Sequence, residues 1–217
     1  MELFELQQDL DDIELRLKKI TDDLDELKTK FSQLNKGNQC EIFDFDKIEY
    51  LSKKYSFGKH PLGKLQDGYA CQLYLEMILH LMSYELDPDS LAEKMVFIQW
   101  LQIQACIDWS LKELYLESTN ITKENYYELV DLLTPKYRES LIVDLLIVAN
   151  MNGKANQEAL IYICNLASIM CISKARVEKL AVVASFVLCQ RISVFTRKEK
   201  IILLDMKSQF EHYLKIM

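Results

Sequence analysis

The chain has 217 residues, half of them hydrophobic, and its formal net charge is −7. This length supplies one globular domain of ordinary size and an extension. Only five Gly and three Pro occur, which disfavours turn-rich all-β architectures, so the composition predicts an all-α fold. The acidic charge argues against a general nucleic-acid binder, because such proteins neutralise phosphates with Lys and Arg.

The six cysteines are spread along the chain and show no C-x-x-C spacing. We therefore expect no zinc or redox site and no cofactor. The first residues, Met-Glu-Leu-Phe-Glu, lack the basic start and the apolar run of a secretory signal, which predicts a cytoplasmic protein. No uninterrupted apolar run approaches about 18 residues, so we expect no membrane-spanning helix.

Residues 1–36 carry a heptad pattern in which apolar residues alternate steps of three and four. This spacing predicts a coiled-coil helix, whose narrow apolar stripe needs a partner helix. Lys36-Gly37-Asn38 then ends it. The seam consists of Leu3, Leu6, Leu10, Ile13, Leu17, Ile20, Leu24, Leu27, Phe31 and Leu34.

The partner of this helix is a second copy, another protein or the body of the same chain, and the sequence leaves these alternatives open. Two copies in antiparallel orientation would place Asp9 beside Lys30 and Arg16 beside Asp23, and both pairs attract. In a parallel pair the attractive and repulsive charge contacts nearly cancel. The charges therefore favour the antiparallel orientation, although each exposed pair contributes only about 0.3–0.5 kcal/mol.

Residues 37–68 are interpreted as a linker with a short helix at 46–54 and a Gly-rich loop at 58–68. Residues 69–217 are interpreted as a helical bundle. Helical spacing predicts helices from Tyr69 to Met82, from Ser90 to Glu117 and from Thr122 to Leu133, and Pro135 opens the next one.

From residue 137 to residue 190 the pattern is helix, Gly turn, helix, capped turn, helix. Gly153 supplies the left-handed residue that ends the first of these helices. Asn156 and Ser173 are expected to cap the second and the third. A last helix begins after Thr196 and carries apolar residues as far as Leu214.

At Asn152, Gly153 and Glu158 this segment resembles the TerB-like (tellurite-resistance-type) helical domain. That domain has a first helix ending in Ala-Asp-Gly, a carboxylate five residues after the glycine and a capped turn after the second helix. The resemblance implies the fold of residues 137–190. In the family, acidic turn residues can bind a divalent cation, but Asn150 and Asn152 replace them here, so we expect no metal.

The three histidines show no spacing typical of a site. His80 lies between Leu79 and Leu81 in an apolar helix and is expected to be a partly buried structural residue. His60 precedes Pro61 in a loop and His212 lies near the end of the chain, so no pair at i and i+4 could hold a metal. No catalytic residues are predicted, and we do not expect an enzyme.

A basic stretch near the C-terminus contrasts with the acidic remainder and could meet an acidic partner or nucleic acid. It consists of Lys174, Arg176, Lys179, Arg191, Arg197, Lys198 and Lys200.

The favoured hypothesis is a non-enzymatic adaptor that forms homo- or hetero-oligomers through its coiled coil. The TerB-like resemblance implies an accessory subunit of a bacterial stress-response or anti-phage defence complex. A nucleic-acid-associated protein that uses the basic stretch and a metal-responsive TerB-like protein are the alternatives.

Overall fold

The computed structural model describes residues 43–54, 59–84, 88–151, 153 and 155–214. The chain divides into two compact units, Met1–Ile42 and Phe43–Met217, and we call the second unit the body. The predicted coiled-coil helix of residues 1–36, with its heptad seam, lies outside the described residues.

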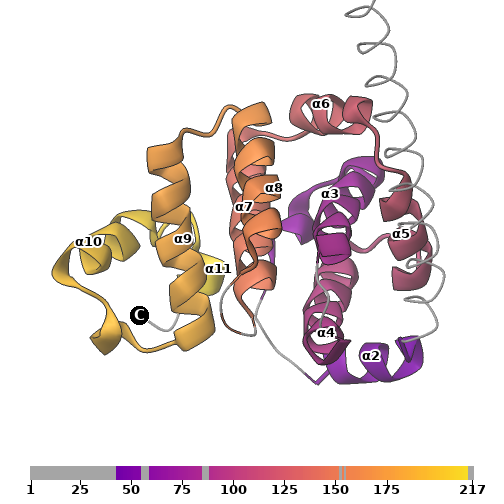
Figure 1. Cartoon of the computed structure of the whole chain (residues 1–217), viewed down its shortest axis with the longest axis horizontal. Coiled ribbons are helices and arrows are strands. Elements are labelled where there is room, and N and C mark those ends of the chain that lie inside the picture. Colours follow the sequence, from indigo (N-terminus) through magenta and orange to yellow (C-terminus); the bar gives the residue numbers. More distant parts are fainter. Residues whose placement is uncertain (1–42, 55–58, 85–87, 152, 154, 215–217) are drawn as a thin grey trace, which may run out of the picture. The chain divides into compact units, whose positions relative to one another are not determined.

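The body is all-α, as the composition predicts, and its described residues form no strand (Figure 1). None of its described helices is both long and apolar enough to cross a membrane. In chain order the α-helices are α2 (Phe45–Ser52), α3 (Gly68–Leu81), α4 (Pro88–Ala105), α5 (Leu111–Glu117), α6 (Lys123–Leu132), α7 (Pro135–Asn150), α8 (Gln157–Ile169), α9 (Lys174–Cys189), α10 (Arg197–Met206) and α11 (Glu211–Leu214). Short 3-10 helices lie between them: η1 (Pro61–Lys64), η2 (Met82–Tyr84), η3 (Ser118–Asn120) and η4 (Ile192–Val194).

Two helices are buried on nearly every side and form the centre of the body. α3 is buried continuously from Leu73 to Leu79, and α7 from Leu141 to Ala149. A helix that is apolar all round needs neighbours on all its faces. Accordingly, α3 packs against α4, α5, α6 and α7, and α7 also packs against α8 and α9 (Figure 1).

The capping residues expected in the second half of the chain begin their helices. Asn156 Oδ1 accepts the N–H of Ala159 at 2.7 Å at the start of α8. Ser173 Oγ accepts the N–H of Arg176 at 3.3 Å at the start of α9. Gly153 has a φ of +123° in the turn after α7. The structure thus contains the three helices predicted between residues 137 and 190.

The single helix expected from Ser90 to Glu117 is wrong, because α4 ends at Ala105 and α5 begins at Leu111. Cys106 adopts a left-handed conformation with a φ of +53°, which ends α4. Ser110 then starts α5 with a capping box: Ser110 Oγ accepts the N–H of Glu113, and the Glu113 carboxylate accepts the N–H of Ser110 at 2.8 Å.

The last helix is also interrupted, since α10 ends at Met206 and a separate short helix, α11, begins at Glu211. The turn between them places Phe210 in the core, where its side chain is fully buried. Of the apolar residues expected to face inward, Ile201 is 52% exposed and Leu204 is 62% exposed. The inward face of α10 is formed instead by Leu203 and Met206.

Part of the expected linker belongs to the body. The short helix predicted near residues 46–54 is present as α2, which packs against α4. Farther along, η1 packs against α4 and α7. A Cβ atom at Gly63 in η1 would lie 3.0 Å from the carbonyl oxygen of Gln104, so glycine permits this close approach to α4.

Candidate functional site

A cluster of polar side chains lies in the core of the body around Asp144. We call His60, Tyr74, Asp144, His212 and Tyr213 the core cluster. The Tyr74 hydroxyl, from α3, donates to Asp144 Oδ2 at 2.6 Å. The Tyr213 hydroxyl, from α11, donates to Asp144 Oδ1 at 2.5 Å. Both carboxylate oxygens are therefore satisfied by phenol groups from opposite ends of the body's sequence.

His60 lies just before η1 and faces the same carboxylate. Its Nδ1 accepts the N–H of Leu62 at 3.2 Å, which assigns the proton of the neutral ring to Nε2. His60 Nε2 lies 3.3 Å from Asp144 Oδ2. The angles are not those of a hydrogen bond, so we treat this contact as an electrostatic one. Both side chains have 0% exposed surface.

His212 completes the core cluster from α11. Its ring centroid lies 5.1 Å from that of His60, and the two rings are nearly perpendicular. Burial and the neighbouring His60 lower the pKa of His212 to about 3, although Asp144 acts in the opposite direction. His212 Nε2 is buried and has no hydrogen-bond partner among the described residues.

The tyrosines of the core cluster are held in their protonated form. Burial raises the pKa of Tyr74 and of Tyr213 well above the usual range, and the negative Asp144 adds to the effect. Both phenols consequently remain donors to the carboxylate throughout the physiological pH range.

Histidine, aspartate and tyrosine are the residue types of acid–base catalysis, but all members of the core cluster except the partly exposed His212 are buried. His60 and Asp144 expose no side-chain surface, so a substrate has no access to the pair. Both oxygens of the buried Asp144 carboxylate accept hydrogen bonds from tyrosines of α3 and α11, and buried hydrogen bonds of this kind specify how elements pack. The arrangement is therefore that of a structural network.

The core cluster has no counterpart in local sequence spacing. His60 and His212 form no pair at i and i+4, yet the fold brings their rings together from distant segments. One local signal was present: Asp144 interrupts the apolar run from Leu141 to Ala149. A carboxylate in a helix buried on all sides requires buried donors.

An open pocket of about 540 Å³ lies on the surface formed by η2, α6 and α8. We call it the tyrosine pocket. Its lining consists of Tyr84, Tyr126, Glu158, Ile161, Tyr162, Asn165, Leu166 and Ile169.

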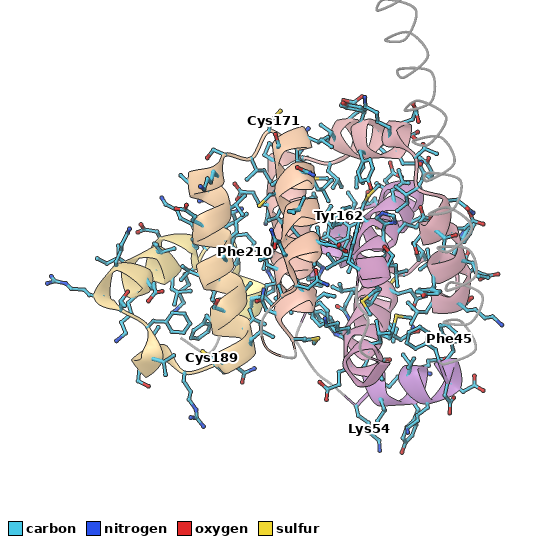
Figure 2. The ribbon with its side chains drawn as sticks, in the orientation of Figure 1. Phe45, Lys54, Tyr162, Cys171, Cys189 and Phe210 are labelled. Carbon is cyan, nitrogen blue, oxygen red and sulfur yellow. The ribbon has the colours of Figure 1, made fainter. Side chains whose placement is uncertain are left out.

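Tyr162 forms the buried centre of this aromatic wall. Its ring centroid lies 5.6 Å from that of Tyr84 and 6.4 Å from that of Tyr126. Its hydroxyl donates to the carbonyl oxygen of Met77 in α3 at 3.0 Å. In Figure 2, Tyr162 lies between α8 and α3, in agreement with this contact. The anchored hydroxyl fixes the orientation of the Tyr162 ring.

Tyr84, another aromatic residue of the pocket, is also held in place. The Asn156 side-chain amide donates to the carbonyl oxygen of Tyr84 at 2.5 Å. Burial raises the pKa of Tyr84, and the negative charge of Glu158 raises it further. Glu158 and Tyr84 both line the pocket.

The basic stretch is distributed over α9, η4 and α10. Arg176 is not free, because its guanidinium forms a fork with the Glu139 carboxylate on α7, with N–O distances of 2.7 and 2.6 Å. Of the other predicted residues, Lys200 is half-buried and the remainder are exposed: Lys174, Lys179, Arg191, Arg197 and Lys198. Their binding to nucleic acid or to an acidic partner stays a prediction.

The turn that carries the TerB-like resemblance is described in part. The Asn150 side-chain amide donates to the carbonyl oxygen of Leu146 at 2.8 Å, so its nitrogen bonds within α7. Glu158 is exposed at the start of α8, and Asn152 lies outside the described residues. Within the part of the chain that the structure describes, no group of three or more His, Cys, Asp or Glu side chains is arranged to hold a metal ion.

Comparison of the chain with known protein families, curated proteins and solved structures gave no match. The TerB-like resemblance therefore stays a prediction from the sequence. The function of the chain has to be inferred from its own residues and their arrangement.

Proposed function

We propose that the chain is a non-enzymatic interaction protein that associates with another helix through the heptad seam of residues 3–34. The observation that carries this proposal is the seam itself, in which every step is three or four residues. A stripe this narrow leaves the rest of the helix surface polar, so its burial requires a second helix.

Two sets of polar groups in the body bond to each other within the fold, which supports a role in association. The histidine–carboxylate pair of the core cluster is fully buried, and Arg176 of the basic stretch is bound to Glu139. These groups stabilise the body and are not presented to a substrate. The finer proposal, an accessory subunit of a bacterial stress-response or anti-phage complex, rests on the TerB-like resemblance alone.

The test is the native mass of the protein purified under mild conditions from its own cells. One chain has a mass of 25.5 kDa, and we expect the wild-type species to be larger. Leu17→Asp, which places a charge at the centre of the seam, should release a species of one chain. Lys19→Glu, outside the seam, is the matched control and should leave the mass unchanged. A wild-type mass of one chain would overturn the proposal.

Where the complex proves to be a homo-oligomer, a charge exchange tests its orientation. Arg16→Glu should weaken self-association by about 0.3–1 kcal/mol for each lost pair, because the introduced carboxylate would then face Asp23 of the second copy. Adding Asp23→Arg should restore it. Sedimentation equilibrium measures both effects, and equal behaviour of the single and double variants contradicts the antiparallel register.

A further inference from the structure

We propose that the tyrosine pocket binds a small methylated ammonium ion, the chemical class to which choline belongs. This inference goes beyond the proposed function, because it concerns a site on the body and does not depend on the heptad seam. It rests on the aromatic wall, one carboxylate and the aliphatic side chains of the same pocket.

The aromatic wall offers the π surface that attracts a cation. Tyr84, Tyr126 and Tyr162 come from three different elements, and their ring centroids lie 5.6 and 6.4 Å apart around Tyr162. Rings at these distances are in contact and form one aromatic surface in the wall of the pocket. A cation within about 6 Å of such a ring is attracted by the negative face of the ring.

One face of α8 supplies the rest of the lining. Glu158, Ile161 and Asn165 follow one another at three- and four-residue spacing on this helix and line the pocket beside Tyr162. Glu158 is an exposed lining residue, and its negative charge raises the pKa of the Tyr84 phenol. The lining thus combines a carboxylate with an aromatic wall.

The charge of Glu158 is available to a ligand. Among the described residues, no Lys, Arg or His forms an ion pair with it. Glu158 also lies in the first turn of α8, where the helix dipole favours an ionised carboxylate. A cation entering the pocket would therefore meet a carboxylate, and no Lys, Arg or His is among the lining residues. The ring of His80 lies next to the aromatic wall, 5.4 Å from that of Tyr162 and 5.9 Å from that of Tyr84.

The aliphatic lining favours methylated ammonium over a primary amine. Ile161, Leu166 and Ile169 contribute methyl and methylene groups, which contact N-methyl groups without loss of hydrogen bonds. A primary ammonium group would need three acceptors. Methylation removes the need for acceptors and lowers the cost of leaving water.

The first experiment titrates the full chain with choline and with its uncharged isostere, 3,3-dimethyl-1-butanol, and follows binding by NMR. We expect choline to bind and the isostere to bind at least tenfold more weakly, because the two differ only in charge. Ethanolamine, the primary amine, should also bind at least several-fold more weakly than choline. Equal binding of choline and the isostere, no binding of choline at 50 mM, or tighter binding of ethanolamine would each overturn the proposal.

Variants identify the site. Glu158→Gln should weaken choline binding about five- to tenfold, whereas Glu178→Gln, an exposed residue of α9 outside the pocket, should leave it unchanged. Tyr126→Leu should reduce binding at least tenfold, and Tyr126→Phe should retain it within about threefold, because the ring face and not the hydroxyl attracts the cation. Circular dichroism checks that each variant is folded. Equal effects of the two glutamate variants, or of the two Tyr126 variants, contradict the site.

Discussion

Among the residues that the structure describes, three other than glycine hold left-handed backbone conformations where helices end. Cys106, Cys171 and Gln190 have φ values of +53°, +59° and +51°. A side chain with a Cβ atom is strained there, at a cost of about 1–3 kcal/mol. The conformation at Cys171 lets the N–H of Ile172 bond to the carbonyl oxygen of Ala167 at 2.8 Å, which closes the end of α8.

Replacing Cys171 with glycine should therefore stabilise the body. Glycine relieves the backbone strain, but its greater freedom in the unfolded chain offsets part of this gain. We expect the free energy of unfolding to increase by about 0.5–1 kcal/mol. Cys164→Gly is the matched control, because Cys164 is equally exposed but lies inside α8. That variant should lose about 0.5–1 kcal/mol. Urea denaturation measures both, and changes of the same sign would contradict the strain.

At the scale of elements, the sequence predicts helices well where a cap and an apolar period coincide. Asn156 and Ser173 mark the starts of α8 and α9 because their side chains bond to the backbone locally, within three residues. The end of α4 at Cys106 could not be predicted, since nothing in a cysteine signals a left-handed residue. At this turn the Gln102 side-chain amide donates to the carbonyl oxygens of Ile107 and Trp109, contacts that no sequence spacing signals.

One ionic fork joins α7 and α9, which also pack extensively against each other. Arg176 holds Glu139 through two N–O contacts and also donates to Gln209 Oε1 at 2.8 Å, and the Gln209 amide bonds back to Glu139. Burial raises the pKa of Glu139, but the hydrogen bonds from Arg176 and Gln209 outweigh it and lower the pKa overall. The fork therefore stabilises the folded chain fully at pH values above the ordinary carboxyl pKa of the unfolded chain. This stabilisation is lost as the pH falls through the lowered pKa of Glu139 in the folded chain.

Arg176→Lys should destabilise the body at neutral pH by about 1–2 kcal/mol, because lysine cannot form the two-armed contact. This loss of stability should become smaller as the pH falls through the lowered pKa of Glu139, because the carboxylate then becomes protonated. Arg191→Lys, an exposed residue, makes the same chemical change and should alter the stability by less than about 0.5 kcal/mol. Chemical denaturation at two pH values tests this, and equal effects of both variants would show that the fork contributes nothing.

At the scale of the whole body, the core cluster joins segments from both ends. Tyr74 and Tyr213 lie 70 and 69 residues from Asp144 in sequence, yet both phenols bond to its carboxylate. His60 and His212 meet beside it. No local spacing encodes such contacts, which is why the sequence predicts the helices of the body but not the polar network in its core. The tyrosine pocket escaped prediction for the same reason, since its three rings come from three elements.

The core cluster also determines how the stability of the body responds to acid. His212 has a pKa of about 3 in the folded chain and about 6.5 when unfolded. Above pH 6.5 it is neutral in both states, so it has no effect. Between these values only the unfolded chain takes up the proton, and stability falls as the pH falls, by at most about 1.4 kcal/mol for each pH unit.

His212→Phe should remove this dependence, because phenylalanine keeps an aromatic ring beside Tyr213 and takes up no proton. The ring centroids of His212 and Tyr213 lie 4.2 Å apart, and the buried Nε2 has no described partner to lose. The free energy of unfolding of the variant, measured by urea denaturation from pH 7 to pH 4, should exceed that of the wild type increasingly toward acid. Parallel curves would mean that the pKa of His212 is the same in the folded and unfolded chains, so that His212 takes up its proton in the folded chain beside Asp144. The core cluster would then hold an ion pair where the present geometry places a neutral ring.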